Sequence, residues 1–511
     1  MSDKPSGYAG DDVVNDAKGT NTPQTPTAGG KPSTSLNDSD LPAVAKISYG
    51  EEREVSEPRF AEGVAAEKLV PEAVEPVAVL VCHGMGQQVR YETLGDLAKS
   101  LMRNSEVAGS STTVRMTRES GNPDKDDLLS RAEIQWRDQQ GGQHEVHLYE
   151  AYWAPLTEGR VTYRDTLKFL FVDAAWPGFK RSSFFRSCRF QRWMFGKPRE
   201  LKIGAGTRIS LVVMVLFLAA QVAIVAAVLA RLAEQLKLIE SSHVAWMQAV
   251  LILLPGLGRW WTAQGMWQHW IAVLEPIGWW LLVAEVLLVR YFLIQYVGDV
   301  AAYISPYKDS KFEQLRHQIQ KVGLDAAKVI YGFTQNPAGA VPYYKRVVMV
   351  GHSLGSVVAY DTLNAAINLD NTCAKDDCRD VAGRTHALIT FGSPLDKTAF
   401  LFRNQPNTLN DPLREQMAAA SQPLIVDYEK FRSRLRWTNL WSPADVISGS
   451  LEYYDNSGPG PDYRELPGDE AYESLHVVNV RDPQARILFR AHVQYWKSDL
   501  LARTLYREIT R

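Results

Sequence analysis

Arg346-Val-Val-Met-Val-Gly-His-Ser-Leu-Gly-Ser-Val-Val-Ala-Tyr360 is the stretch of sequence that decides the fold. Its first part, Val347–Val350, is a short apolar run rich in β-branched residues, and it predicts a buried strand. From Val357 onward the apolar spacing is that of a helix. A strand, a tight turn and a helix therefore follow one another, with Ser353 at the turn.

The turn has the pattern Gly-x-Ser-x-Gly, in which both glycines have a steric role. A side chain at Gly351 or Gly355 would collide with the neighbouring strand or helix. In such a nucleophile elbow the serine hydroxyl projects above a sheet, and the backbone N–H of the next residue, Leu354, can hold an oxyanion. The alternative is a glycine-rich turn with an inert serine. The strand before Ser353 and the helix after it make that alternative the less favoured one.

A second turn belongs to the same architecture. Val77–Cys82 is a continuous apolar run that predicts another buried strand, and it leads directly into His83-Gly-Met-Gly86. Gly84 and Gly86 let the chain approach a reacting group closely, so that the backbone N–H of Met85 points at an oxyanion. Either turn alone is a weak signal, but both require the same fold and strengthen each other.

With these two turns the chain resembles α/β-hydrolases of the lipase and esterase type, similar to intracellular serine lipases that carry Gly-His-Ser-Leu-Gly. The resemblance covers roughly residues 75–155 and 340–505. It implies an α/β fold with a mostly parallel sheet flanked by helices. It also implies hydrolysis of carboxylic esters through an acyl-enzyme on Ser353, with no metal and no cofactor.

The triad histidine is sought after Ser353, because in this fold the chain order is serine, acid, histidine. Three histidines follow, and catalytic groups of a parallel sheet lie at the carboxyl ends of its strands. His386 and His476 begin their predicted strands and so fall at the wrong edge. His492 follows the last predicted strand, on the loop before the final helix, and its His-Val-Gln-Tyr context resembles that of many lipases.

Two aspartates compete for the role of the acid. Asp445 follows the predicted strand 436–441, and Asp396 follows the predicted strand 386–391. Both lie at the correct edge, but an Asp followed two residues later by a β-branched apolar residue resembles the acid of lipases. We therefore favour Asp445, with Asp396 as the alternative. His492 would take the proton of Ser353, and Asp445 would orient the imidazole and stabilise its cation.

Composition excludes several classes of protein. The formal net charge of −2 over 511 residues does not indicate nucleic-acid binding. Four cysteines are too few for a disulfide framework in a chain of this length, and reduced thiols are the favoured interpretation. Residues 1–45 are polar and rich in Gly, Ser, Thr and Pro, so we expect a disordered tail with no secretory signal.

The middle of the chain predicts a membrane insertion. Nine Lys or Arg residues lie between Lys180 and Arg208, interleaved with aromatic residues, and form a basic collar. An apolar span follows at about 209–230, long enough to cross a bilayer, and a weaker one at about 271–294. The loop between the spans has few basic residues, so both flanks are expected in the cytoplasm. The two turns must also meet in one site, which requires an even number of crossings.

The predicted organisation is therefore a hydrolase domain interrupted by a two-helix hairpin. Residues 46–179 form its first half, residues 180–305 the collar and hairpin, and residues 306–511 its second half. The expected surroundings are the lipid bilayer, with the catalytic domain on the cytoplasmic side, and the hairpin could also pair two copies of the chain.

The hairpin is the only clue to the substrate. It favours an acyl ester of a lipid. Two alternatives remain open from the sequence: an esterase or thioesterase acting on a soluble or protein-linked acyl group, and a catalytically silent scaffold that binds a membrane partner.

Overall fold

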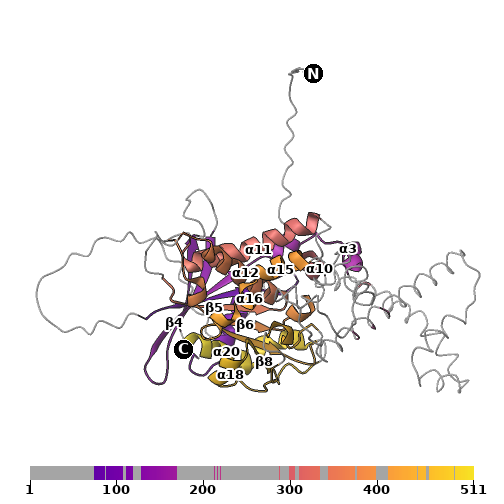
Figure 1. Cartoon of the computed structure of the whole chain (residues 1–511). Coiled ribbons are helices and arrows are strands. Elements are labelled where there is room, and N and C mark those ends of the chain that lie inside the picture. Colours follow the sequence, from indigo (N-terminus) through magenta and orange to yellow (C-terminus); the bar gives the residue numbers. More distant parts are fainter. Residues whose placement is uncertain are drawn as a thin grey trace, which may run out of the picture. The chain divides into compact units, whose positions relative to one another are not determined.

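The computed structural model consists of two units, residues 1–46 and 47–511, and every described residue belongs to the second. It describes residues 74–86, 88–107, 111–118, 128–169, 298–304, 310–333, 343–374, 377–398, 412–445, 447–455, 460–487 and 490–511, and the single residues Val212, Leu216, Ala219 and Leu287 (Figure 1). The predicted tail and collar, and both predicted spans apart from those single residues, lie outside this set. Within it, no helix is both long enough and apolar enough to cross a membrane.

An eight-stranded sheet organises the described residues, in the order β2-β3-β4-β1-β5-β6-β7-β8. Neighbouring strands run parallel from β4 to β8, whereas β3 is antiparallel to both of its neighbours. The predicted α/β class with a mostly parallel sheet is thereby confirmed. The strands are β1 (Val77–Cys82), β2 (Ser111–Arg118), β3 (Leu128–Arg137), β4 (Gln143–Ala151), β5 (Arg346–His352), β6 (Thr385–Phe391), β7 (Arg436–Trp441) and β8 (Val477–Arg481).

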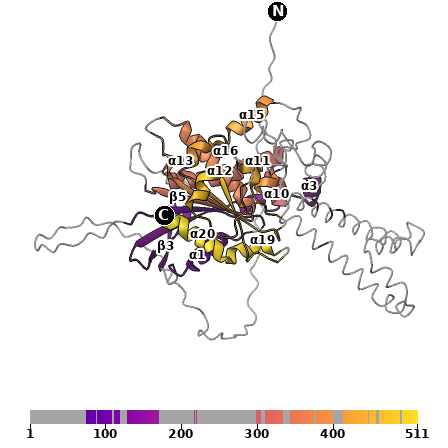
Figure 2. The ribbon, with the colours of Figure 1, turned by 60° about the horizontal axis from the view of Figure 1, so that its bottom comes forward.

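Helices cover both faces of the sheet (Figures 1 and 2). One face carries α10 (Gly298–Ile304), α11 (Ser310–Tyr331) and α12 (Leu354–Asn371), and the other carries α1 (Glu92–Met102) and α20 (Asp499–Thr510). The remaining helices are α2 (Ala154–Thr157), α3 (Tyr163–Lys168), α13 (Val381–Arg384), α15 (Pro412–Ala420), α16 (Pro423–Val426), α17 (Tyr428–Phe431), η4 (Glu452–Tyr454), α18 (Asp469–Ser474), α19 (Ala491–Gln494) and η5 (Tyr495–Lys497).

The run of six apolar residues in β1 is explained by these two layers. Alternate side chains of a strand point to opposite faces, so Ala78 and Leu80 enter the core under α12 while Val79 and Val81 enter the core under α1. All six residues of β1 are buried. A strand covered on both sides has no polar face to display.

The carboxyl ends of β1 and β5 form the point at which the sheet changes direction. From β1 the chain continues to β2, β3 and β4 on one side, and from β5 it continues to β6, β7 and β8 on the other. Ligand sites of open α/β sheets lie in the crevice at such a switch point. Both predicted turns, His83–Gly86 and Gly351–Gly355, lie here because Cys82 pairs with Gly351.

Apart from the four single residues named above, the description is interrupted between residues 169 and 298, and the elements on either side of this gap are neighbours. Helices α3 and α10 lie side by side in both views (Figures 1 and 2). A Cβ built on Gly298 would be only 3.3 Å from the Val161 side chain. The described residues on either side of positions 170–297 therefore lie close together.

Gly355 provides a direct test of this packing. A Cβ there would lie 2.1 Å from the carbonyl oxygen of Cys82, a backbone atom that cannot turn aside. We expect Gly355→Ala to destabilise the fold by ~2 kcal/mol or more. A Cβ added to Gly95 in α1 would meet no atom within 4 Å, so Gly95→Ala should instead stabilise the helix by ~0.5–1 kcal/mol. Urea unfolding in detergent measures both, and equal effects would contradict the packing described here.

Candidate active site

Ser353 occupies a strained turn between β5 and α12. Its φ of 54° and ψ of −131° are unusual for a residue with a side chain. The turn persists because its surroundings hold it: the Ser353 N–H donates to the carbonyl of Phe391, at 3.0 Å, and α12 begins at the next residue. Strain of this kind is typical of a residue whose side chain must be presented in a fixed direction.

Three side chains from distant parts of the chain form a continuous relay. His492 Nδ1 is 2.9 Å from Asp445 Oδ2, and His492 Nε2 is 2.8 Å from Ser353 Oγ. Because a carboxylate only accepts, Nδ1 carries the proton and Nε2 accepts from the serine hydroxyl. The structure thus brings together the serine, histidine and favoured acid predicted from the sequence. His492 lies in the single-turn helix α19 rather than in a loop, a small difference from the expectation.

Asp445 is held as a buried carboxylate. Burial raises the pKa of Asp445, but the charge and hydrogen bond of His492 and the N–H of Ile447 more than offset this, so the net pKa is lowered. The Ile447 N–H donates to its second oxygen at 3.0 Å, and the Tyr495 hydroxyl donates to Oδ2 at 3.1 Å. The negative charge that would stabilise an imidazolium is therefore present at neutral pH.

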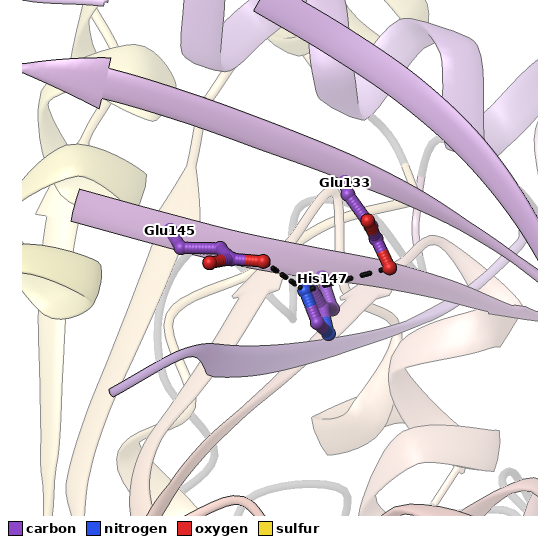
Figure 3. A group of neighbouring side chains, drawn as sticks. All are labelled: Glu133, Glu145 and His147. Carbon is purple, nitrogen blue, oxygen red and sulfur yellow. Dashed lines mark hydrogen bonds and ion pairs between the residues drawn. The ribbon is translucent and has the colours of Figure 1, made fainter. Parts of the chain in front are cut away.

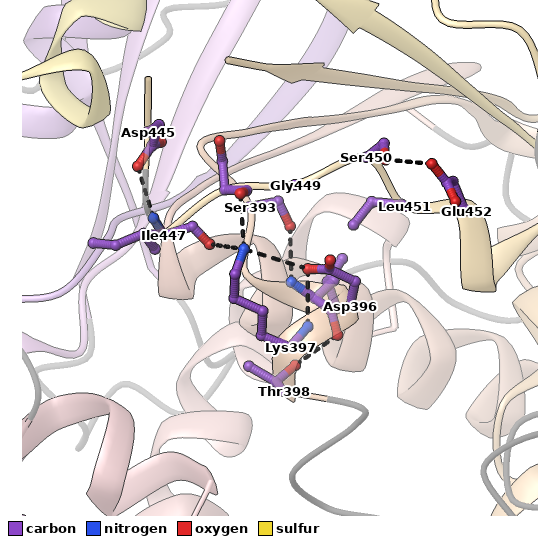
Figure 4. A network of polar contacts seen from close by, with 12 residues as sticks. Ser393, Asp396, Lys397, Thr398, Asp445, Ile447, Gly449, Ser450, Leu451 and Glu452 are labelled. Atoms are coloured by element: carbon purple, nitrogen blue, oxygen red, sulfur yellow. Dashed lines mark hydrogen bonds and ion pairs between the residues drawn. The ribbon is translucent and has the colours of Figure 1, made fainter. Parts of the chain in front are cut away.

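Asp396, the alternative acid, has a different position. It is fully buried, and its Oδ1 lies 3.9 Å from Nζ of Lys397 (Figure 4). The same ammonium donates to the carbonyl oxygens of Ile447, at 2.9 Å, and of Ser448, at 2.7 Å. These carbonyls follow Asp445 in the chain, so Lys397 with its counter-ion Asp396 holds the loop that carries the acid.

The other two histidines after Ser353 lie away from the relay. His386 is the second residue of β6, and its Nε2 lies 3.5 Å from a carboxylate oxygen of Glu508 in α20. His476 precedes β8 and packs edge-on against Tyr428, with the ring centroids 4.1 Å apart. His476 is buried.

The His83–Gly86 turn lies directly against the nucleophile. A Cβ on Gly84 would be 2.9 Å from Cβ of Ser353, a separation that only glycine allows. Met85 lies in this turn, and Leu354 begins α12 directly after Ser353. Both predicted oxyanion donors therefore belong to segments that meet at Ser353.

His83 fixes the shape of that turn. Its Nε2 accepts from the N–H groups of Trp153 and Ala154, at 3.0 and 3.1 Å, so Nδ1 carries the proton and donates to the Gly84 carbonyl at 2.8 Å. The ring also stacks on Trp153, with centroids 4.4 Å apart. Burial lowers the pKa of His83 to about 4, despite the opposing bond to Gly84. The neutral imidazole is thus a structural brace for the turn.

His352, Lys397 and Tyr495 are contributors that were not predicted from the sequence. His352 Nε2 donates to the carbonyl of His492 at 2.9 Å and so holds the backbone that carries the triad imidazole. The sequence signal for His352 and Tyr495 was present, since one lies inside the Gly-His-Ser motif and the other inside His-Val-Gln-Tyr. Nothing in the sequence around Lys397 marks it.

No protein-family model, no curated protein and no solved structure matches the chain. The assignment of this site therefore rests on the contacts described above.

One other polar cluster has the geometry of a metal site. Ligand atoms of Glu133, Glu145 and His147 lie within 4.8 Å of one another (Figure 3). However, Arg131 Nε donates to Glu133 at 2.8 Å, and His147 Nε2 is 2.7 Å from Glu145. The positive charge of the Arg131 guanidinium, next to the Glu133 carboxylate, disfavours the binding of a metal cation there. Since His147 pairs with Ala78, near the amino end of β1, the cluster also lies towards the opposite edge of the sheet from the relay.

Three buried histidines make a testable contribution to stability. Burial lowers the pKa of His83 to about 4 and those of His352 and His476 to about 3, from an ordinary 6.5. The unfolded chain then binds more protons below pH 6.5, so their stabilisation is complete above that pH and is lost as the pH falls. Each contributes at most ~1.4 kcal/mol per pH unit. Buried acids with raised pKa values, Glu150 and Asp299 among them, act in the opposite sense.

Because these groups act in opposite senses, the contribution of one histidine is measured by comparing wild type with a variant that lacks it. We expect the difference in unfolding free energy between wild type and His476→Gln to change by ~1.4 kcal/mol per pH unit between about pH 6 and 4. Urea unfolding at each pH gives this difference, and a difference independent of pH would contradict a buried neutral His476.

Proposed function

We propose that the protein is a membrane-anchored serine hydrolase with an α/β-hydrolase fold, which cleaves the acyl ester bond of a lipid. The observation that carries the proposal is the Asp445–His492–Ser353 relay beside two backbone N–H groups, at the switch point of a mostly parallel sheet. The three residues also follow one another in the order serine, acid, histidine.

The reaction follows from these contacts. Ser353 Oγ attacks the acyl carbonyl carbon while its proton passes to His492 Nε2, and Asp445 stabilises the resulting imidazolium. The carbonyl oxygen becomes an oxyanion, held by the N–H groups of Met85 and Leu354, with each donor contributing ~3 kcal/mol. The ester carbon–oxygen bond then breaks, and the leaving alcohol takes the proton from His492.

The acyl-enzyme is released by the same groups in reverse. Water gives a proton to His492 Nε2 and attacks the acyl carbon, and a second oxyanion forms in the same place. Its collapse returns the proton to Ser353 and frees the carboxylic acid. Every proton in the cycle is carried by His492, so no further group is required.

Exposed apolar side chains favour a lipid over a soluble substrate. Val89 and Tyr91 follow the His83–Gly86 turn, and Ile487 and Val493 flank His492, all with at least 43% of their surface exposed. Apolar groups exposed in the two segments that carry the catalytic machinery suit an acyl chain or a bilayer surface. Of the predicted spans, Val212, Leu216, Ala219 and Leu287 are described, and all four are helical and exposed.

A membrane insertion with two spans and a cytoplasmic catalytic domain is part of the proposal. Its support is the charge asymmetry of the sequence and the proximity of α3 to α10, since a hairpin must leave and rejoin the domain at neighbouring points.

The triad is tested by conservative variants. Ser353→Ala should abolish hydrolysis of a p-nitrophenyl ester and labelling by a fluorophosphonate. Asp445→Asn should lower kcat by ~10⁴-fold, because the amide favours the wrong imidazole tautomer. Asp396→Asn should cost far less, since that residue lies outside the relay and pairs with Lys397. A larger loss for Asp396→Asn than for Asp445→Asn would overturn the assignment, and an unlabelled wild type would indicate a silent scaffold.

The membrane role is tested by deleting residues 205–297. The variant should leave the membrane fraction on ultracentrifugation and retain the rate on a soluble p-nitrophenyl ester. Its rate on an acyl lipid in vesicles should fall ~10-fold or more, because the site is no longer concentrated at the bilayer. A variant that stays in the membrane fraction contradicts the hairpin, and one that keeps both rates indicates a soluble substrate.

A further inference from the structure

We propose that Asp299 is a positioning residue that sets the direction of the Met85 oxyanion donor. This inference rests on the proposed function. Asp299 is the second residue of α10, and its Oδ2 accepts from the N–H of Gly86 at 2.7 Å. The bond joins residues 213 positions apart and lies in the interior of the protein.

The peptide planes around Met85 explain why this bond matters. The Met85 N–H shares a rigid plane with the Gly84 carbonyl, and that carbonyl accepts from His83 Nδ1. In a trans peptide the N–H points away from the carbonyl, so His83 directs the Met85 N–H away from itself. The next plane contains the Gly86 N–H, which Asp299 holds. Met85 is therefore fixed on both sides, by an imidazole before it and a carboxylate after it.

The chemistry of Asp299 supports a dedicated role. Only 6% of its surface is exposed. Burial raises the pKa of Asp299 to about 6, while the bonds from Gly86 and from the Thr157 hydroxyl act to lower it. Above that pH it is a buried carboxylate, whose bond to the backbone N–H is stronger than that of a neutral acceptor. Buried acids with shifted pKa values are concentrated at functional sites.

A loose turn would be costly for catalysis in particular. Gly86 has a φ of 95°, and residues 84–86 form no helix or strand that could hold the N–H groups in place. Without the Asp299 bond Met85 would be held only on its His83 side, so the turn could shift and carry the Met85 N–H away from the place where the oxyanion forms. Loss of one such donor costs ~10²–10³ in kcat.

The experiment compares three variants of the full chain on a p-nitrophenyl ester. Asp299→Leu removes the acceptor and should lower kcat by ~100-fold with KM within about threefold. It should weaken inhibition by a trifluoromethyl ketone, which forms an oxyanion on Ser353, by a similar factor. Asp299→Asn keeps an oxygen that accepts from Gly86 and should recover kcat to within about tenfold of wild type.

A matched control variant tests whether destabilising α10 is by itself enough to lower kcat. Tyr303 lies one turn further along α10, where its hydroxyl donates to Asp361 of α12 at 2.6 Å. Tyr303→Phe loses this buried bond and should lower the thermal midpoint while leaving kcat within about threefold.

The outcomes separate the inference from the function on which it rests. The inference is wrong if Asp299→Leu stays within threefold of wild type, if Tyr303→Phe loses kcat equally, or if Asp299→Asn fails to recover it. A wild type without esterase activity would overturn the proposed function and this inference with it.

Discussion

The close approach of two turns at the carboxyl ends of β1 and β5 is the constraint on which the rest of the structure depends. Gly84 lies against the side chain of Ser353, and Gly355 lies against the carbonyls that end β1. No side chain fits between these segments, so the backbone N–H groups after each strand reach the same small volume. The strained conformation of Ser353 is a consequence of the same contact, because the elbow must turn sharply to enter α12.

Around that contact the protein uses buried charges and neutral imidazoles in complementary ways. Asp445 is kept ionised by the groups that donate to it, whereas His83 and His352 are kept neutral by burial and act as fixed donors. The loop after Asp445 is held by Lys397, and the turn after β1 by Asp299. The helix that carries Asp299 is also the first described helix after residues 170–297, and through Asp299 it contacts the His83–Gly86 turn.

Much of this arrangement could be predicted from the sequence. A strand covered on both faces has an unbroken run of apolar residues in the sequence. The bounds of β1 and β5 could therefore be predicted closely. Chain order and the rule that sites lie at carboxyl ends were enough to select His492 over His386 and His476. Asp299 and Lys397 could not be found in the same way. Their partners lie 213 and about 50 residues away in the chain, and such pairings depend on the folded path.

Ser353 is the activated nucleophile of the proposed mechanism, and trapping of the acyl-enzyme tests this most directly. The protein would be mixed with an acyl ester, quenched in acid within the first turnovers and digested for mass spectrometry. We predict one acyl group on the peptide that contains Ser353, and none on the same peptide of Ser353→Ala. An acyl group on another residue, or hydrolysis with no covalent species under conditions where the acyl-enzyme should accumulate, would contradict the mechanism.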